Sequence, residues 1–386
     1  MKKRILIVHN YYQILGGEDT VVANEKKMLE EHGHTVFLYT RNNSEINKMN
    51  IFRKMFLPFT TIYNPRTAKD IKKIIKEQHI DIIHVHNTLN LISPAVYYVA
   101  KKCGIPVVQT VHNFRLLCPK ATFYRDGKIC EDCVSRGLKC AIKYGCYRNS
   151  RLQTLICVIS TKIHRLTGIY GKINYICLTE FTKQKLLTLS QIRPQQVFIK
   201  PNVVFDFGGN AKPEDYFVYV GRLEEIKGIN LLFDAFQRIP DIKLKVIGTG
   251  DLEETLKRRI ENEHLENIDL LGQRNREEVN KVVHNAKALI MCSQWYETFG
   301  MVIVEAYSNG VPVIVGNIGN IKELVINGTT GELFDYNSVN QLIEKIRKLS
   351  GCNTAEMGYR GYQYYKTHFA PEINYETLLS IYEKIV

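Results

Sequence analysis

The sequence of 386 residues has no long apolar run. No stretch approaches the roughly 18 uninterrupted apolar residues that a membrane-spanning helix needs, so we expect no transmembrane segment. The start, MKKRILIVHNYY, is basic and then briefly apolar, but no small-residue cleavage site follows it. It therefore predicts a buried first strand and not a signal peptide, and we expect a cytoplasmic protein.

Acidic residues are scarce in the first half of the chain. Residues 1–205 contain 32 Lys and Arg against 13 Asp and Glu, whereas residues 206–386 contain 20 against 26. The halves therefore carry net charges of +19 (32 − 13) and −6 (20 − 26). Such a basic half predicts an anionic partner, which could be a membrane surface, nucleic acid or a phosphorylated acceptor.

Short runs rich in Val and Ile alternate with helical patterns in both halves. This alternation is typical of βαβ units around buried parallel sheets. The expected strands are 4–9, 35–40, 81–86, 106–112, 175–179 and 197–200, then 216–221, 243–248, 268–272, 288–292, 312–315 and 331–334. Helices are expected at 20–32, 67–78, 229–238 and 252–264, among others. The predicted fold class is α/β, with two doubly wound, Rossmann-like domains.

The domain boundary is expected in residues 201–215, which are rich in Pro, Gly, Asn and Asp and show little periodicity. We predict an N-terminal domain over 1–203 and a C-terminal domain over 204–369, with a final helix at about 370–386 that packs back on the first domain. Open α/β sheets bind ligands at the carboxyl ends of their strands. Two facing domains would therefore form an interdomain active site.

Two glutamates frame the strongest candidate site, in SQWYETFGMVIVEAYSNGVP. Glu297 lies in the loop after a strand, and Glu305 lies on a helix expected to begin near Phe299. The first N–H groups of that helix, at Phe299, Gly300 and Met301, could bind a phosphate or diphosphate. Glu305 could accept hydrogen bonds from two neighbouring hydroxyls, as on a ribose. The spacing alone is common, and both could instead be ordinary solvated glutamates.

Two cations are expected beside these glutamates. The segment GRLEEIKG ends the first strand of the second domain and places Arg222 and Lys227 at its carboxyl end. They could neutralise a diphosphate leaving group. The turn VIGTGDL, with Gly248 and Gly250, looks like half of a dinucleotide fingerprint, but the third glycine is missing and NAD binding is a poor interpretation.

In these motifs the sequence resembles glycosyltransferase family 4, the retaining nucleotide-sugar transferases of the GT-B fold. The resemblance is carried by GRLEEIKG, by the E-x-FG-x4-E element at residues 297–305 and by the EAYSNGVPVI stretch. It implies that Arg222 and Lys227 bind the donor diphosphate, Glu305 the ribose and Glu297 the sugar hydroxyls. A departure occurs at residues 318–323, IGNIKE, where members often have Gly-Gly before a glutamate.

The resemblance extends to the rest of the site. It implies that Gly16 and Gly17, a pair that permits positive φ and close backbone approach, lie against the donor phosphates, and that Gly248 and Gly250 join the donor site. His112 corresponds to the histidine that contacts the donor sugar. Arg274 is a candidate, with Gln273, for contact with the base. His84 and His86 are expected to face opposite sides of one strand, and we assign both to structure.

A cysteine-rich segment at about 115–151 interrupts the βα alternation and is interpreted as an insertion. Two of its cysteines have the C-x-x-C spacing of zinc ligands. The predicted set for a structural zinc is Cys118, Cys130, Cys133 and Cys146, with Cys140 as the substitute; free thiols in a basic loop are the alternative. No cofactor is expected for catalysis.

Acceptor and location follow from the basic first domain. Residues 151–172 suit a basic amphipathic helix on an anionic membrane, although packing on its own domain is equally compatible, and residues 51–59 are a second candidate contact. We expect a UDP- or GDP-linked donor, a lipid-linked glycan acceptor of a surface polysaccharide, and no nucleic acid. The alternatives are a nucleotide-sugar epimerase and a polyanion- or lipid-binding protein with a relict sugar site.

Overall fold

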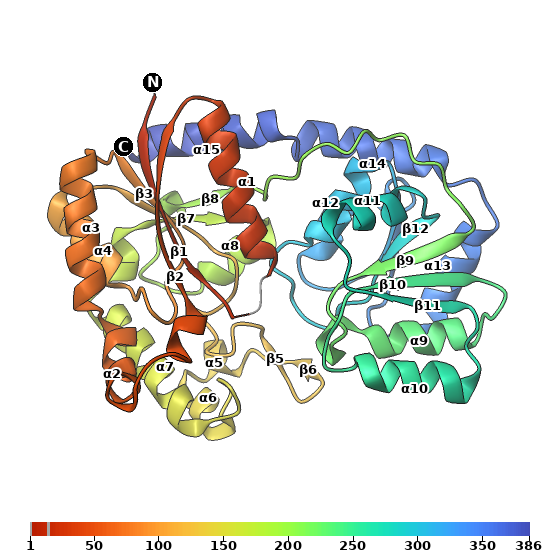
Figure 1. Cartoon of the computed structure of the whole chain (residues 1–386), viewed down its shortest axis with the longest axis horizontal. Helices are drawn as coiled ribbons and strands as arrows, with labels where there is room; N and C mark the ends of the chain where they lie inside the picture. Colours follow the sequence, from red (N-terminus) through yellow and green to blue (C-terminus); the bar gives the residue numbers. More distant parts are fainter. Residues whose placement is uncertain (1, 14–15) are drawn as a thin grey trace. The chain divides into compact units, whose positions relative to one another are not determined.

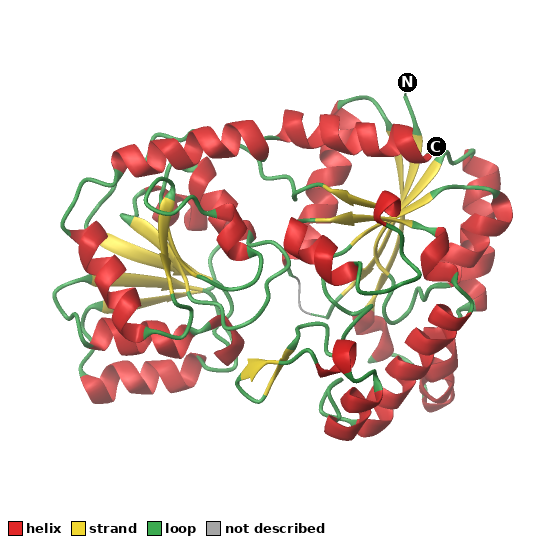
Figure 2. Cartoon of the chain, turned by 180° about the vertical axis from the view of Figure 1, so that it is seen from behind, coloured by secondary structure: helices red, strands yellow, loops and turns green. Residues whose placement is uncertain are grey.

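The computed structural model describes residues 2–13 and 16–386. The chain forms two compact units (Figure 1). The first comprises Met1–Thr122, Glu131–Val203 and Asn374–Val386, and the second comprises Phe123–Cys130 and Val204–Ile373. In each unit, helices cover both faces of a parallel sheet (Figure 2).

The sheet of the first unit has the strand order β2-β1-β3-β4-β7-β8. All of its neighbouring strands are parallel. The central strands are hydrophobic on both faces, as expected for a sheet covered by helices on either side. The strands are β1 (Arg4–Tyr11), β2 (Thr35–Asn42), β3 (Ile82–Asn87), β4 (Val107–Thr110), β7 (Asn174–Cys177) and β8 (Val197–Ile199).

The helices of the first unit connect these strands. Asparagine or serine side chains cap several of them, since they satisfy backbone N–H groups of the first turn. The helices are α1 (Gly17–Glu31), α2 (Ile51–Ile62), α3 (Pro65–Gln78), α4 (Ala95–Cys103), α5 (Asp132–Ser135), α6 (Lys139–Tyr144), α7 (Arg151–Leu166), α8 (Glu180–Leu186) and α15 (Pro371–Ile385), with short 3-10 turns η1 (Asn43–Ile46), η2 (Ile169–Lys172) and η3 (Pro194–Gln196).

The sheet of the second unit has the order β11-β10-β9-β12-β13-β14, also all parallel. Its strands are β9 (Tyr216–Val220), β10 (Lys243–Ile247), β11 (Ile268–Gly272), β12 (Ala288–Met291), β13 (Val313–Gly316) and β14 (Gly331–Phe334). Its helices are α9 (Ile229–Gln237), α10 (Glu253–Glu263), α11 (Arg276–His284), α12 (Met301–Ser308), α13 (Val339–Ser350) and α14 (Ala355–His368), with 3-10 turns η4 (Glu225–Lys227) and η5 (Ile321–Leu324).

Two segments belong to a different unit from the residues next to them in the sequence. Leu378, Ile381 and Tyr382 of α15 pack in the core of the first unit, beside Ile5 and Val108. The hairpin of β5 (Tyr124–Arg125) and β6 (Lys128–Ile129) groups with the second unit, although it comes from residues that we assigned to the first domain. Its neighbour Phe123 contacts Tyr296 edge to face, with ring centroids 6.3 Å apart. In the part of the chain that the structure describes, no helix is long and apolar enough to cross a membrane.

Candidate functional site

The second unit has a topological switch point between β9 and β12. These strands are adjacent, but the chain leaves them toward opposite edges of the sheet. The loops that follow diverge at such a point and leave a crevice, which is where open α/β sheets bind ligands. The two loops here are residues 221–228 after β9 and residues 292–300 after β12, which are the two motifs that the sequence singled out.

Glycines allow the turns around this crevice to touch backbone to backbone. A Cβ on Gly248, whose φ is +136°, would lie 1.9 Å from the carbonyl oxygen of Gly221. A Cβ on Gly250 would lie 2.5 Å from the carbonyl oxygen of Leu223, and one on Gly228 would lie 1.9 Å from that of Cys292. Gly248 and Gly250 thus fix the shape of the turn after β9, a packing role that needs no ligand.

The pair Glu297 and Lys227 joins the two loops. Oε1 of Glu297 lies 2.7 Å from Nζ of Lys227 and also accepts hydrogen bonds from Oγ of Ser293 at 2.7 Å and Nε1 of Trp295 at 2.8 Å. The ammonium of Lys227 also lies over the Trp295 ring, 5.3 Å from its centroid. All three donors use one oxygen, so Oε2 has no hydrogen-bond partner among the described residues and can accept from a ligand hydroxyl.

Arg222 lies in the same loop but is more exposed. Its Nη1 donates to Oε1 of Glu224 at 2.6 Å, and the Arg222 side chain is 57% exposed. An exposed pair of this kind is weak, about 0–1 kcal/mol. The guanidinium can therefore exchange Glu224 for an anionic ligand at little cost.

The helix of the candidate phosphate site, α12, begins at Met301, two residues later than expected. Gly300 is its N-cap, with φ +108°, a conformation that favours glycine. Phe299 is buried, and its carbonyl accepts from Nδ2 of Asn320 at 3.3 Å. The side chain of Phe299 is therefore part of the core, and only backbone groups of residues 299–301 could face a phosphate.

Glu305 is half-buried on α12, and its partner is a residue that our sequence analysis missed. Burial raises the pKa of Glu305, and the positive charge of Arg276 opposes that rise. Arg276 is the first residue of α11, and its guanidinium lies over the Phe207 ring. Arg274, the predicted base contact, is exposed two residues before it. The sequence analysis gave Arg274 to the base and assigned no role to Arg276.

His112 belongs to a cluster of histidines in the first unit. Its Nε2 lies 2.9 Å from Nδ1 of His86, and the two rings are stacked. His86 in turn stacks on His84 with centroids 4.4 Å apart. The expectation that His84 and His86 face opposite sides is wrong, because residues i and i+2 of a strand share a face. Burial is the main cause that lowers the pKa values of His86 and His112, that of His86 to about 4.

The predicted glycine loop lies partly outside the described residues, at positions 14 and 15. Gly16 is the N-cap of α1 with φ −131°, and Gly17 starts the helix. Neither takes a positive φ, contrary to our expectation, and a Cβ on either would meet nothing within 4 Å. The next residue, Glu18, has its pKa raised to about 8 by burial and by Asp19, against the pull of Arg115.

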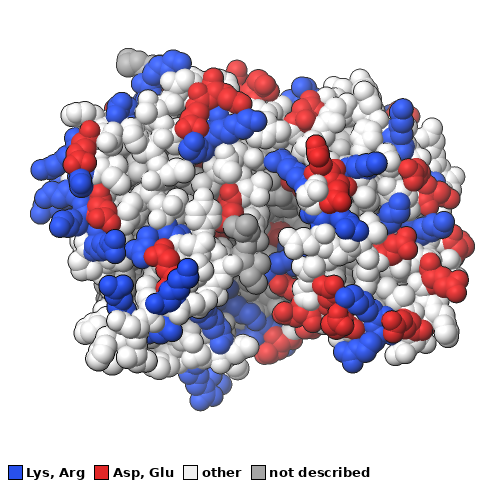
Figure 3. Space-filling model, viewed as in Figure 1, with Lys and Arg blue, Asp and Glu red and all other residues white. Residues whose placement is uncertain are grey.

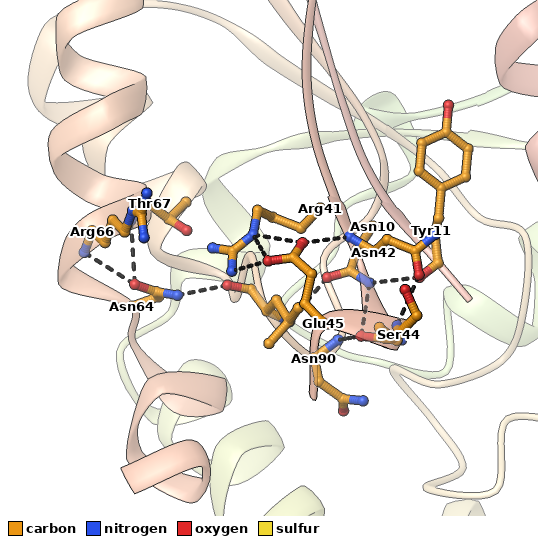
Figure 4. Close-up of polar contacts among 12 residues, drawn as sticks. Asn10, Tyr11, Arg41, Asn42, Ser44, Glu45, Asn64, Arg66, Thr67 and Asn90 are labelled. Carbon is orange, nitrogen blue, oxygen red and sulfur yellow. Dashed lines mark hydrogen bonds and ion pairs between the residues drawn. The ribbon is translucent and has the colours of Figure 1, made fainter. Parts of the chain in front are cut away.

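An asparagine network holds the loops at the carboxyl ends of β1, β2 and β3 (Figure 4). Nδ2 of Asn10 donates to Oδ1 of Asn43 at 3.0 Å, and that oxygen also accepts from the backbone of Asn90 at 3.3 Å. Oδ1 of Asn10 accepts from the backbone of Leu91 at 2.9 Å. These bonds fix the loop after β3, which lines a pocket with His86, His112 and the half-buried Arg115.

No three of the four cysteines predicted to bind zinc, all of which the structure describes, have their sulfur atoms within 4.8 Å of one another. Among residues 2–13 and 16–386, Glu25, His84 and His86 form the one group of three or more His, Cys, Asp or Glu with ligand atoms within 4.8 Å. Cys133 and Cys146 pack on a small apolar cluster around Val158, Cys118 is buried, and Cys130 belongs to the second unit. Zinc binding stays a prediction of the cysteine spacing.

Comparison with known proteins identifies the family. Residues 204–364 match the model for glycosyl transferases group 1, and residues 15–132 match that for glycosyltransferase family 4. An uncharacterised glycosyltransferase of Methanocaldococcus jannaschii is 26% identical over 90% of this chain and 88% of its own. The UDP-Gal:alpha-D-GlcNAc-diphosphoundecaprenol alpha-1,3-galactosyltransferase of Escherichia coli is 24% identical over 90% and 88%.

Solved structures agree with this assignment. The Anabaena protein HepE, in complex with UDP and glucose, superposes with a TM-score of 0.68 at 18% identity, over 98% of this chain and 99% of that one. At that identity the likeness shows the fold. The chain therefore belongs to the family 4 glycosyltransferases, with two Rossmann-like domains in the GT-B fold.

Proposed function

We propose that this glycosyltransferase moves a sugar from a UDP- or GDP-linked donor to a hydroxyl of a lipid-linked glycan, with retention of anomeric configuration. The observation that carries the proposal is the Lys227–Glu297 pair, which joins the two loops of the switch point and keeps one carboxylate oxygen for a ligand. The second unit holds the donor, and the first unit holds the acceptor.

The geometry of the second unit supports a set of donor contacts. Lys227 and Arg222 supply positive charge to the diphosphate, and the N-terminus of α12 adds backbone donors at Gly300 and Met301. Glu305 accepts from the ribose hydroxyls, while Oε2 of Glu297 accepts from the sugar. The UDP in the Anabaena structure and the UDP-galactose donor of the E. coli relative support a nucleoside-diphosphate donor.

We propose that the departing diphosphate is stabilised by these groups and that the acceptor hydroxyl attacks from the same face. Lys227 and the helix N-terminus act on the charge as it develops, which makes a metal unnecessary for this role. In the first unit, His112 contacts the donor sugar, and Gly16 and Gly17 leave room for the phosphates because no side chain lies within 4 Å of either Cβ position.

Nucleoside diphosphate release measures this reaction. The wild-type protein, incubated with UDP- and GDP-sugars and a lipid-linked acceptor, should release nucleoside diphosphate only with its own donor. Lys227→Met should reduce kcat/KM by about a hundredfold or more, as loss of a charge-stabilising group does. Lys257→Met is the matched control, since Lys257 also pairs with glutamates of the second unit. Equal loss in both variants would contradict the assignment of Lys227.

We further propose that the acceptor is reached on an anionic membrane, to which α2 and α7 bind. On α2, Ile51, Phe52, Met55, Phe56 and Phe59 are 58–73% exposed, and Thr61 is its one buried residue among those described. A soluble helix normally buries such side chains. The E. coli relative acts on a diphosphoundecaprenol-linked sugar, as its name states.

The neighbouring helix continues this apolar surface. Leu152, Leu155, Ile159, Ile163 and Leu166 of α7 are all exposed and follow one helical face. The two helices are in contact, and Nε2 of His164 lies 3.0 Å from the carbonyl oxygen of Ile62. We call these ten side chains, together with the basic residues around them, the α2–α7 surface.

The excess of basic residues on the α2–α7 surface favours an anionic bilayer as its partner. Residues 136–179 contain eight Lys and Arg and no Asp or Glu, and residues 46–69 contain five Lys and Arg and no acidic residue. Where Figure 1 places α2, α6 and α7, Figure 3 shows white and blue side chains with little red. Each basic residue near an anionic leaflet adds about 1 kcal/mol, and each apolar side chain that inserts fully adds about 1.5–3 kcal/mol.

Vesicle sedimentation tests the α2–α7 surface. The protein should bind vesicles that contain phosphatidylglycerol and bind pure phosphatidylcholine much more weakly. Replacing Phe52, Phe56 and Phe59 with serine should reduce binding about a thousandfold or more where all three insert fully, whereas Tyr359→Ser, an exposed aromatic of the second unit, should not. Unchanged binding of the triple variant would refute the surface, and turnover of a soluble acceptor by that variant would show that the donor site is intact.

A further inference from the structure

Behind His112, the first unit buries a chain of ionisable residues that the proposed reaction does not use. Glu25 comes from α1, His84 and His86 come from β3, and Lys200 follows β8. Each of these four side chains is at most 2% exposed. Buried charges are costly unless they are paired, so the arrangement of this cluster is narrowly constrained.

The contacts run in one line from Lys200 to His112. Nζ of Lys200 lies 3.1 Å from Oε2 of Glu25, and Oε1 of Glu25 lies 3.4 Å from Nε2 of His86. Nδ1 of His86 lies 2.9 Å from Nε2 of His112. His84 flanks the line, with Nδ1 2.8 Å from Oε1 of Glu25 and Nε2 2.7 Å from Oγ1 of Thr110.

The charges of the chain follow from its surroundings. Burial would raise the pKa of Glu25, but His84 and Lys200 outweigh it and bring that pKa well below its ordinary value. Glu25 is therefore a carboxylate at neutral pH. Burial lowers the pKa of both His86 and His112, so that both rings are neutral there.

Two neutral imidazoles between a carboxylate and a ligand have one favourable arrangement of protons. A carboxylate only accepts, so the His86 nitrogen that faces it, Nε2, carries the proton. Nδ1 of His86 then has a lone pair and accepts from Nε2–H of His112. The reverse arrangement would place the lone pair of His86 Nε2 against the negative charge of Glu25.

We propose that Glu25 and His86 are positioning residues that hold His112 in the Nε2–H tautomer, so that its Nδ1 accepts a hydrogen bond from a sugar hydroxyl. This inference rests on the proposed function in that His112 contacts the sugar. Glu25 acts here through its charge, because Nε2 of His86 lies 3.4 Å from it without hydrogen-bond geometry. The hydrogen bond from His112 to His86 then carries that preference to His112, as the partners of a histidine commonly fix its tautomer.

A metal ion is the competing use of the same side chains, because Glu25, His84 and His86 offer three ligand atoms within 4.8 Å. The position of Lys200 argues against it. A divalent cation at Glu25 would lie close to the buried ammonium, which is 3.1 Å from that carboxylate. Protons shared along the chain avoid this repulsion.

Nitrogen-15 NMR of protein labelled at histidine reads the tautomer directly, with His112 assigned from the His112→Gln spectrum. The wild type should show a pyrrole-type Nε2 and a pyridine-type Nδ1 for His112. Glu25→Gln should reverse the pattern. Lys200 draws the amide oxygen of the glutamine toward itself, so the NH2 group faces His86 and donates to its Nε2.

Turnover gives the second readout. Glu25→Gln should lower kcat about ten- to a hundredfold, in the range seen when outer-shell partners of a histidine are removed, with little change in the donor KM. Glu332→Gln is the matched control, because Glu332 is an equally buried carboxylate that pairs with Lys345 and Lys348 of the second unit. It should change neither kcat nor KM.

The wild-type spectrum alone reports the tautomer of His112, even where a variant fails to fold. A proton on Nδ1 of His112 in the wild type, or the same tautomer in a folded Glu25→Gln protein, would overturn it. A shift of the His84 and His86 signals on titration with Zn²⁺ alone would favour the metal site instead. Full activity of His112→Ala would refute the sugar contact in the proposed function and leave the tautomer result as a separate question.

Discussion

Substitution of Glu297 by glutamine separates the two things that this side chain does. In the structure, Oε1 holds Lys227, Ser293 and Trp295, and Oε2 is kept for a ligand. Glutamine has nearly the same shape, and its carbonyl oxygen can still accept from the three donors. What it loses is the negative charge and one of the two acceptor oxygens.

The size of each loss follows from these contacts. The ion pair is partly exposed, with side-chain exposures of 11% and 20% for Glu297 and Lys227, so solvent screens some of its energy. We expect about 1–2 kcal/mol of lost stability, or a fall in Tm of about 2–8 °C. A hydrogen bond from a sugar hydroxyl to a carboxylate contributes about 1.5–3 kcal/mol, and its loss in the transition state would lower kcat about ten- to a hundredfold.

Initial rates and calorimetric binding of the free nucleoside diphosphate distinguish the roles. Glu297→Gln should lower kcat with only a modest loss of diphosphate affinity, since the sugar contact is absent from that ligand. The control Glu332→Gln should cost stability without changing kcat. A folded Glu297→Gln protein with kcat within about threefold of the wild type would show that Glu297 only supports the loop.

Three further outcomes are expected. Gly248→Ala should destabilise the protein by about 3 kcal/mol or more in chemical denaturation, because the added Cβ meets a backbone oxygen at 1.9 Å, whereas Gly104→Ala, with φ +71° and open space, should cost about 1 kcal/mol. Glu18 is neutral below its raised pKa of about 8, so its contribution to stability is lost as the pH rises toward 8; Glu18→Gln should show a smaller fall in Tm from pH 5 to pH 9 than the wild type. Arg276→Ala removes the charge that opposes the raised pKa of Glu305, so nucleotide affinity should be lost at a higher pH on acidification; an unchanged midpoint would refute the contact.

The fold was largely predictable because buried parallel strands have a clear sequence pattern. A strand buried on both faces needs a run of Val and Ile, and the expected strands over 4–9 and 216–221 correspond to β1 and β9 within two residues at either end. The hairpin at 124–129 was missed, because two-residue strands carry no periodicity. The helix α2 was not predicted as a helix, and residues 51–59 were singled out only as a candidate membrane contact.

The candidate site was predictable as a set of residues but not as a set of contacts. The sequence motifs contain Glu297 and Lys227, yet the sequence does not show that the two side chains bind each other. Arg276 was not singled out, because no motif marks it and only the folded chain brings its charge near Glu305. Glu25 and Lys200 carry no motif, and only the folded chain brings Glu25 to His86 and Lys200 to Glu25.

The most direct test of the central claim is to identify both products of one reaction. The account predicts that wild-type protein with its nucleotide sugar and a lipid-linked acceptor releases one nucleoside diphosphate for each glycosylated acceptor, and that proton NMR shows the anomeric configuration of the donor retained in the new bond. Inversion of that configuration would contradict the proposed mechanism. Conversion of the nucleotide sugar to its epimer without release of nucleoside diphosphate would contradict the transfer itself.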